Sequence, residues 1–292
     1  MSFIRAAGIS LFFLCAVAST SAALEWPLSM AELVASFGTP ARNRFTTGVM
    51  LAATDGLVRA SSAGEIIFAA DENRKRSALP SILGSFVALE HEGGMIGLYA
   101  GMEGGTVSSY LARVKPGDLL GRTGASGPMD GEGLYFSVFD RKAARWVNPL
   151  LLLPKLAESR PPIVRSAALV GTSRTWILGD SRPVPQGTYS VAIDVFDPTS
   201  AAWSMGPSAP YSIRLVVDGV KIVELIFDIA SERDGRLSLF SSIPKDYAAY
   251  RHSDGRIILG SRLFYRGKAL VEVYVSDYAG NERSFAWSVV IE

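Results

Sequence analysis

Few side chains in this sequence could hold a catalytic metal or transfer a proton. The chain has 292 residues, with two histidines, His91 and His252, and one cysteine, Cys15. A catalytic zinc ion usually takes three protein ligands from histidine, carboxylate or cysteine and leaves a fourth position to water. The two histidines fall in different predicted domains, so the chain does not assemble the common histidine-rich zinc sites.

Other familiar catalytic patterns are absent from the sequence. A Ser-His-Asp arrangement needs a histidine beside an activated serine, and no Gly-x-Ser-x-Gly turn stands between a strand and a helix. There is no phosphate-cradling glycine loop and no dinucleotide-binding fingerprint. The residue inventory therefore points away from these enzyme classes.

Acidic residues near His91 and in one glycine-rich loop are the remaining candidates for chemistry. Glu90 and Glu92 flank His91, but side chains alternate along a strand, so both carboxylates should face away from the imidazole. Asp130 and Glu132 could bind a cation, yet a dedicated calcium loop supplies six or more oxygens in a recognisable order. We therefore expect a structural role for His91 and turn roles for the two loop acids.

The stretch from Gly124 to Val138 joins a glycine-rich turn to an alternating strand. Alternation places Gly133 and Tyr135 on one face and Leu134 and Phe136 on the other. If a catalytic centre lay at this strand, Gly133 and Tyr135 would point into it. Glycine and tyrosine are not the usual residues of a metal centre, so the strand has the outline of such a site without its ligands.

The N-terminal 23 residues have the pattern of a secretory signal peptide. Arg5 gives a basic start, Ile9 to Val17 form an apolar core, and Ser19 to Ala23 are the small residues that a signal peptidase accepts. The apolar run is shorter than the roughly 20 residues of a membrane-spanning helix. We expect cleavage at the end of this segment, with retention as an anchor as the alternative, and a periplasmic or cell-envelope location.

The expected mature chain has neither cysteine nor excess charge. Cys15 lies inside the signal, so no disulfide or thiolate metal site is expected. The whole chain has 29 basic and 28 acidic residues. Removing Arg5 leaves a balance that does not favour nucleic acid as a partner, because phosphate binding needs a basic surface. No later stretch is long enough to span a bilayer, so no stable membrane span is expected after cleavage.

Short strands dominate the elements that would position these residues. From Phe45 to Val138 short apolar runs alternate with turn formers such as Asp55-Gly56 and Pro116-Gly117, which is typical of an antiparallel β domain. A proline-containing linker follows, and the Asp218-Gly219 pair predicts a tight hairpin in the second half. The fold class is therefore mostly β, and we expect the second half to be an immunoglobulin-like β-sandwich.

The domain organisation that we predict has four parts. They are a signal peptide at 1–23, a β domain at 24–154, a linker at 155–165 and the sandwich at 166–292. Consecutive prolines mark the linker, since they donate no backbone hydrogen bonds and stiffen the chain.

Several segments of the first domain resemble, in order and spacing, the lysostaphin or LytM-type zinc peptidase domain. The resemblance covers roughly residues 38–154 and is strongest from Val114 to Val138, which includes Val-Lys-Pro-Gly-Asp and Gly-Leu-Tyr-Phe-Ser-Val. Enzymes of this family cut peptide cross-links in peptidoglycan with zinc held by a His-x-x-x-Asp pair and a His-x-His pair. The resemblance implies the fold, and it implies the reaction only if the ligands are present.

The family's zinc positions hold other residues in this chain. The resemblance places Thr46 and Met50 at the first histidine and the aspartate, and Gly133 and Tyr135 at the His-x-His pair. Gly101 stands where the family has a further histidine in a Tyr-Ala-His-Leu segment. Threonine, methionine and glycine do not replace the imidazole and carboxylate groups that hold zinc and lower the pKa of its water. We therefore expect no metal, no cofactor and no catalytic residue.

Three functions remain open on this basis. In the first, the protein is a non-catalytic envelope factor, in which a groove lined by Tyr99, Tyr135, Gly133, Thr46 and Met50 binds a peptidoglycan peptide or an envelope hydrolase. In the second, it is an active peptidoglycan metalloendopeptidase with relocated ligands. In the third, both domains are structural spacers and the tyrosines only pack, since tyrosine is amphipathic enough for either role. The histidine count favours a pseudoenzyme over the active peptidase.

Overall fold

A computed structural model describes residues 24–41, 44–73, 81–108, 112–129, 131–199, 201, 207–241, 245–246 and 250–292. The predicted signal peptide and Asp130 lie outside these residues. In the part of the chain that is described, no helix has both the length and the apolar character needed to cross a membrane.

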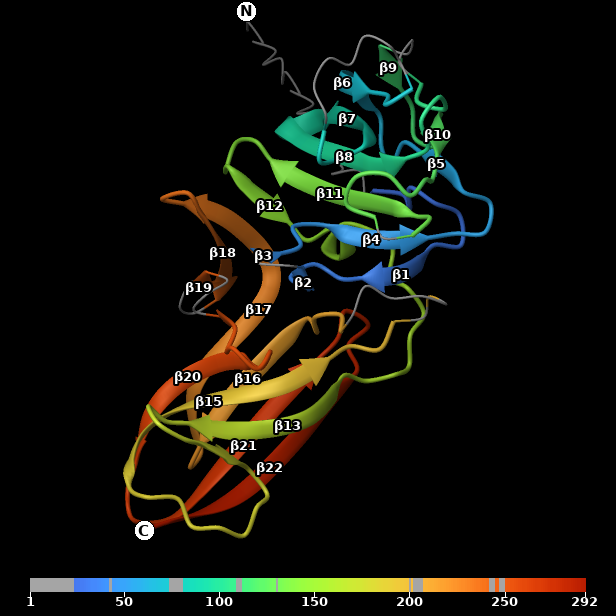
Figure 1. Cartoon of the computed structure of the whole chain (residues 1–292). Coiled ribbons are helices and arrows are strands. Elements are labelled where there is room, and N and C mark those ends of the chain that lie inside the picture. Colours follow the sequence, from blue (N-terminus) through green and yellow to red (C-terminus); the bar gives the residue numbers. More distant parts are fainter. Residues whose placement is uncertain are drawn as a thin grey trace, which may run out of the picture.

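The expected fold class is confirmed: the described residues are mostly strands in antiparallel sheets, with short 3-10 helices between some of them. The N-terminal module is built on a sheet in the order β4-β11-β8-β7-β6-β9, with β1 beside β4 (Figure 1). Its strands are β1 (Glu32–Ala35), β4 (Val49–Ala52), β6 (Gly64–Ala70), β7 (Ser85–His91), β8 (Met95–Met102), β9 (Arg113–Val114) and β11 (Leu134–Asp140). Smaller pairs are β2 (Pro40–Ala41) with β3 (Arg44–Phe45), and β5 (Leu57–Arg59) with β10 (Leu119–Arg122); η1 (Glu92–Gly94) and η2 (Pro149–Leu151) are the 3-10 helices.

Strand β11 alternates as the sequence predicts. Leu134 and Phe136 are fully buried in the main core of the N-terminal module. Tyr135 belongs to a different cluster on the other face of the sheet. Because successive side chains of a strand point to opposite faces, a single short segment supplies both clusters.

The C-terminal module is a sandwich of two antiparallel sheets. One has the order β14-β13-β15-β20 and the other runs β22-β21-β16-β17. The strands are β13 (Ile163–Val170), β14 (Thr175–Ile177), β15 (Gly187–Phe196), β16 (Ser212–Val217), β17 (Val220–Arg233), β18 (Arg236–Ser241), β19 (Lys245–Asp246), β20 (Ile257–Phe264), β21 (Gly267–Ser276) and β22 (Glu282–Ile291). Strands β13, β15 and β20 share one sheet and β16, β21 and β22 the other, as strands A, B, E and C, F, G do in the immunoglobulin fold, whereas β17 pairs with β16.

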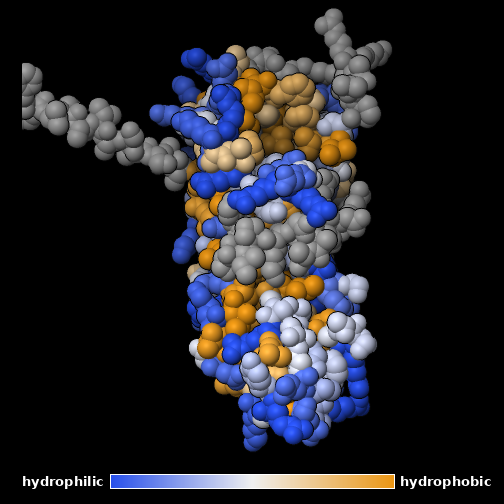
Figure 2. All heavy atoms as spheres, turned by 90° about the vertical axis from the view of Figure 1, so that its left-hand side faces the viewer, coloured by the Kyte–Doolittle hydropathy of each residue, from blue (hydrophilic) through white to orange (hydrophobic). Residues whose placement is uncertain are grey.

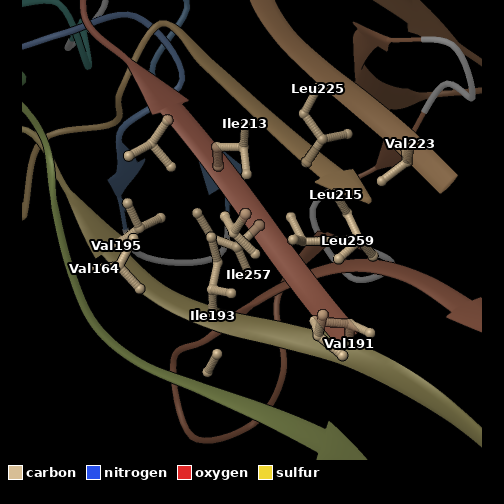
Figure 3. Packing of buried hydrophobic residues seen from close by; sticks show 14 of the residues in the cluster. Val164, Val191, Ile193, Val195, Ile213, Leu215, Val223, Leu225, Ile257 and Leu259 are labelled. Carbon is tan, nitrogen blue, oxygen red and sulfur yellow. The ribbon is translucent and has the colours of Figure 1, made fainter. Parts of the chain in front are cut away.

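The apolar faces of the two sheets form the core of the sandwich. Figure 3 shows Val191 and Ile193 of one sheet facing Ile213 and Leu215 of the other. The predicted hairpin between β16 and β17 is present. Asp218 and Gly219 both have positive φ, at 50° and 74°, which suits a type I′ turn and explains the Asp-Gly pair.

The two modules share a continuous sheet. Strand β12 (Arg145–Val147) pairs with β11 on one side and with β17 on the other. Figure 1 shows β17 running from the sandwich up to the N-terminal module. Strand β13 begins at Ile163, within the segment that we interpreted as a linker, so little chain separates the modules.

A second contact joins the modules through their cores. Phe37 and Phe45 of the N-terminal module are buried in the cluster that fills the sandwich. The ring of Phe45 lies 6.3 Å from that of Tyr250, which in turn lies 5.9 Å from the ring of Phe227. Part of the N-terminal module is therefore a component of the C-terminal core.

Candidate functional site

The five positions at which the resemblance places metal ligands or the further histidine are all buried. Thr46, Met50 and Tyr135 are 8%, 3% and 9% exposed, and Gly101 and Gly133 are also buried. Strand register places Met50 directly opposite Tyr135 in the β4–β11 pair. The structure thus brings these two together, as a shared site requires, but beneath the surface.

Met129 fills the space beside the two glycines. A Cβ built on Gly133 would lie 2.6 Å from Met129 Cε and 2.6 Å from the carbonyl oxygen of Leu51. A Cβ on Gly101 would lie 2.5 Å from Met129 Cγ, and its φ of +80° is strained for any other residue. The volume that a histidine would need at either position is already taken.

Met129 belongs to a small apolar cluster on this face of the sheet. We call it the methionine cluster; its buried members are Val34, Ala35, Met50, Ala100, Met129 and Tyr135. The Tyr135 hydroxyl lies 3.0 Å from Thr47 Oγ1 at hydrogen-bonding distance. Tyrosine is thereby held with its ring in the cluster and its polar end satisfied.

Thr46 takes part in the contact between the modules. Its hydroxyl donates to the carbonyl oxygen of Ser36 at 2.9 Å. Ser36 donates from its amide to Ser208 Oγ at 2.9 Å and from its hydroxyl to the Ala209 carbonyl at 2.6 Å. Ser208 and Ala209 belong to the C-terminal module, so Thr46 supports a buried polar network that joins the two.

These side chains do not fit a zinc ion. Zinc is held by imidazole, thiolate or carboxylate groups. Here Thr46 is engaged with a backbone carbonyl, Met50 offers a neutral thioether, and the Tyr135 phenol is paired with Thr47. Across the described ranges no cluster of three or more His, Cys, Asp or Glu side chains is arranged to hold a metal.

Tyr99 does not lie where we expected. It faces away from Tyr135 because it is paired with Phe136 in the β8–β11 register, whereas Tyr135 is paired with Ala100. Tyr99 is fully buried in the main core, and its hydroxyl accepts the Ser61 amide at 2.9 Å. Burial raises the pKa of Tyr99 to about 12. Including Tyr99 in a groove with Tyr135 is therefore wrong.

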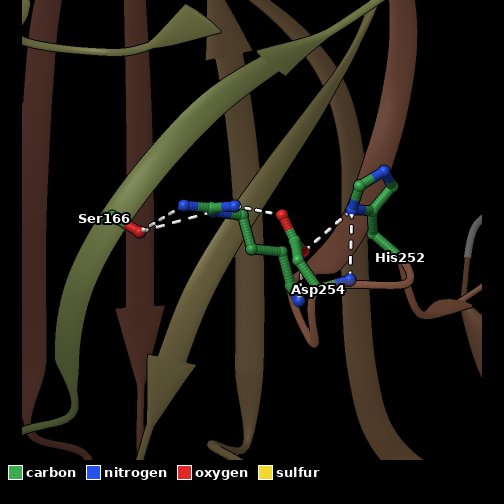
Figure 4. A network of polar contacts seen from close by, with 4 residues as sticks. Ser166, His252 and Asp254 are labelled. Carbon is green, nitrogen blue, oxygen red and sulfur yellow. Dashed lines mark hydrogen bonds and ion pairs between the residues drawn. The ribbon is translucent and has the colours of Figure 1, made fainter. Parts of the chain in front are cut away.

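The two histidines lie in different modules, as predicted. Nδ1 of His91 donates to the Ala63 carbonyl at 2.9 Å, and burial lowers the pKa of the imidazole, which favours a neutral structural side chain. His252 Nδ1 lies 2.8 Å from Asp254 Oδ1 in a turn before β20. Asp254 also contacts Arg256, whose guanidinium reaches Ser166 Oγ; Figure 4 shows Asp254 between Ser166 and His252. Ser166 is hydrogen-bonded to Arg256 and not to His252, so these residues do not form a catalytic triad.

One of the two loop acids, Glu132, has a local contact, and Asp130 lies outside the described residues. Glu132 accepts a hydrogen bond from the Thr123 hydroxyl at 3.2 Å. Glu132 is exposed, which agrees with a turn role.

Comparison with known families identifies the N-terminal module. Residues 44–149 match the family model described as peptidase family M23, and residues 161–292 match a second, separate family model. Residues 44–149 are an M23 domain. A search of curated proteins finds no significant match to the chain.

Solved structures resemble the chain at low sequence identity. The SpoIIQ–SpoIIIAH pore-forming complex contains a chain that is 22% identical, with 45% of this chain and 91% of that one covered, at a TM-score of 0.36. A zinc-containing peptidase from Vibrio cholerae is 18% identical, with 47% and 41% covered and a TM-score of 0.36. Lysostaphin from Staphylococcus simulans is 14% identical, with 89% and 94% covered and a TM-score of 0.33.

Beyond the methionine cluster, the same face of the M23 domain carries one exposed and two partly buried apolar side chains. Phe86 and Leu98 are partly buried against the cluster. Phe68 is 58% exposed and stacks on Phe86 with ring centroids 5.5 Å apart. We call Phe68, Phe86 and Leu98 the apolar sheet face. Figure 2 shows that hydrophobic atoms gather on the N-terminal module at the top of the view.

Sequence reasoning missed Met129 and the apolar sheet face. Met129 stands in a glycine-rich loop, where a lone methionine gives no signal that it will pack onto two distant glycines. The glycines at two family histidine positions could have raised the question of which side chain occupies the space that a histidine would take. The sequence does not identify that side chain, because Gly101 and Gly133 come from different segments and only the fold brings Met129 between them.

Proposed function

We propose that the protein is a non-catalytic, exported component of the bacterial cell envelope whose M23 domain binds a partner and does not cleave peptidoglycan. The observation that carries this is the packing of Met129 against Gly101 and Gly133. Zinc hydrolysis needs ligands that hold the metal and a position for its water. Met129 occupies the space beside Gly101 and Gly133, and the side chains of Thr46, Met50 and Tyr135 are not zinc ligands.

The burial of the former ligand positions bears on what the domain binds. A peptidoglycan peptide in a groove at Tyr135 would need access to a side chain that is 9% exposed. The apolar sheet face presents the exposed ring of Phe68 beside the partly buried Phe86 and Leu98, and exposed apolar side chains that lie together suit a protein interaction site. We therefore favour a partner protein, such as an envelope hydrolase that the M23 domain positions or regulates, over a bound peptide.

Export is part of the same proposal and is supported by the N-terminal sequence. The basic start, short apolar core and small residues before position 24 match a signal peptide. Expression with its own N-terminus in a bacterial host, followed by fractionation and mass measurement, should give a shortened protein in the periplasmic fraction. Full-length protein in the cytosol would contradict export.

The absence of catalysis is tested on the purified mature protein. We expect elemental analysis to find no stoichiometric zinc after purification in zinc-containing buffer, and no release of soluble fragments from cross-linked peptidoglycan. An active M23 peptidase serves as the positive control. One zinc per chain together with peptide turnover would refute the pseudoenzyme and support relocated ligands.

The binding surface is tested with Phe68→Ser, which changes an exposed side chain and should leave the fold intact. Leu119→Ser is the matched control, because Leu119 is also an exposed apolar strand residue, at 45%, and lies on the separate β5–β10 pair. We expect Phe68→Ser to weaken capture of a purified cell-wall hydrolase and Leu119→Ser to leave it unchanged. Tyr135→Ala, assayed on sacculi, tests the peptide-binding alternative.

The structural-spacer function also has a specific observation in its favour. The β12–β17 pairing makes one continuous sheet of the two modules, which suits a rigid element. Equal behaviour of wild type, Phe68→Ser and Tyr135→Ala toward both hydrolases and sacculi would favour the spacer over a binding function.

A further inference from the structure

A small cavity lies at the junction of the two modules and does not include any residue of the methionine cluster. Its volume is ≈ 30 Å³, enough for one or two water-sized groups. The apolar walls come from both ends of the N-terminal module: Trp26, Leu33, Leu150 and Leu156. The cavity is therefore small, and its lining is partly apolar and partly polar.

Two carboxylates line the same cavity. Asp197, which follows β15, is 4% exposed, and its Oδ1 has no hydrogen-bond partner among the described atoms. Glu158, from the segment after η2, is the second; its nearest cation is Arg160, with 3.7 Å between Glu158 Oε1 and Arg160 Nε. A buried carboxylate without a partner is unfavourable unless it is protonated or matched by a cation.

We propose that this cavity binds an aliphatic primary ammonium group, with Asp197 and Glu158 as the anionic partners and the apolar wall against the alkyl stem. Three observations select this chemistry. The cavity volume matches a single ammonium group, two carboxylates line the cavity beside apolar side chains, and Asp197 Oδ1 lacks a donor. A lysine side chain has this shape, since its ammonium carries three donors on a flexible four-carbon stem.

A divalent metal fits the cavity less well. Calcium takes six or more oxygen ligands, and only two carboxylates line this cavity. The nearby Asp277 is already engaged, because its Oδ1 accepts the amides of Gly280 and Asn281 at 2.8 Å each and its Oδ2 accepts the Asn281 side chain at 2.7 Å. The chain's own Lys155 also borders the cavity, but no ion pair joins it to Asp197 or Glu158 within the described residues.

Protonation of Asp197 gives the site a recognisable pH dependence. Burial, reinforced by the charges of Glu158 and Asp277 and opposed by Arg160, raises the pKa of Asp197 to about 8. An ammonium must therefore displace a proton below that pH. The charged and titratable groups around Asp197 are Glu158, Arg160, Asp277, Tyr278 and Lys155. Affinity should rise about tenfold per pH unit up to pH 8 and then level off, because the amine stays charged to about pH 10.

The probe is n-butylamine, with n-butanol as its neutral counterpart, titrated into ¹⁵N-labelled mature protein at pH 8. The indole N–H of Trp26 reports on the cavity, which Trp26 lines. We expect a saturable shift with n-butylamine and none with n-butanol. Gly-Lys-Gly and its Nε-acetylated form then test whether the site accepts a lysine within a peptide. Binding of the unmodified peptide without binding of the acetylated peptide assigns the site to a lysine ammonium.

Asp197→Asn is the decisive variant, because it keeps the shape and the backbone contact of the Asp197 amide with the Ser208 carbonyl. It should weaken n-butylamine at least tenfold, whereas Asp180→Asn, which removes an exposed carboxylate of the same module, should leave the affinity unchanged. Glu158→Gln should cause a smaller loss. Equal affinity in Asp197→Asn and wild type, no saturable shift, or an equal response to n-butanol would each overturn the proposal. The site lies apart from the apolar sheet face, so its failure leaves the proposed function standing.

Discussion

Replacing Asp197 by asparagine should stabilise the protein, and by an amount that grows with pH. The pKa of Asp197 is raised from 3.8 to about 8 in the folded state, first by burial and then by the charges of Glu158 and Asp277. Between these two pH values the folded carboxyl holds a proton that the unfolded chain releases. Raising the pH therefore favours unfolding, and wild type loses stability across this window.

The size of the effect follows from the shift in pKa. Each pH unit inside the window lowers the free energy of unfolding by about 1.4 kcal/mol, so the loss between pH 5 and pH 8 is about 4 kcal/mol. Asparagine does not titrate. The Asp197→Asn variant should match wild type near pH 4 and exceed its stability by several kcal/mol at pH 8.

Urea denaturation of both proteins at pH 5, 6, 7 and 8 measures this difference. Other groups titrate in both proteins, so the difference between them isolates Asp197. Equal m-values confirm that the same surface is exposed on unfolding. A stability difference that does not change with pH would refute the reasoning, because it would mean that Asp197 has the same protonation state in the folded and the unfolded protein from pH 5 to pH 8.

Three further substitutions test the packing. Met129→Ala should cost about 2–5 kcal/mol, the usual range for removing a buried methionine, measured by urea denaturation; a loss below about 1 kcal/mol would show that Met129 does not fill the site. Gly133→His should destabilise the protein, because its Cβ meets the Leu51 carbonyl oxygen at 2.6 Å, and should bind no zinc on elemental analysis. Asn148→Ala should cost at least about 1–3 kcal/mol, since the Asn148 side chain is fully buried and donates to the Phe227 carbonyl at 2.7 Å; an unchanged melting temperature would contradict this.

Local patterns in the sequence predict much of the fold. Alternation correctly separates Leu134 and Phe136 from Tyr135, because the period of a strand is a property of its own residues. The Asp218-Gly219 turn is also local, since two residues with positive φ satisfy it. The pairing of β12 with β17 is different. It joins strands that are distant in the sequence, and neither strand has a sequence pattern that identifies its partner.

The candidate site also combines features that the sequence predicts with features that depend on long-range contacts. The family positions Met50 and Tyr135 lie opposite each other, whereas Thr46 belongs to the contact between the modules and Tyr99 lies on the other face of the sheet. A shift of one residue in the β8–β11 register exchanges the two faces of a strand, and the register places Ala100, not Tyr99, opposite Tyr135. The unpartnered Asp197 was also missed, because burial of a carboxylate is decided by what surrounds it in three dimensions.

The replacements at the former ligand positions depend on one another. A histidine at Gly133 would clash with Met129 and the Leu51 carbonyl oxygen. A histidine at Gly101 would clash with Met129 and would need an unfavourable positive φ. A histidine at Thr46 would remove the hydroxyl that bonds Ser36, whose own contacts reach the C-terminal module. A zinc site and the present packing are therefore competing uses of the same residues. Restoring one ligand at a time should lower stability at each step without bringing the metal, because binding begins only when several ligands are present together.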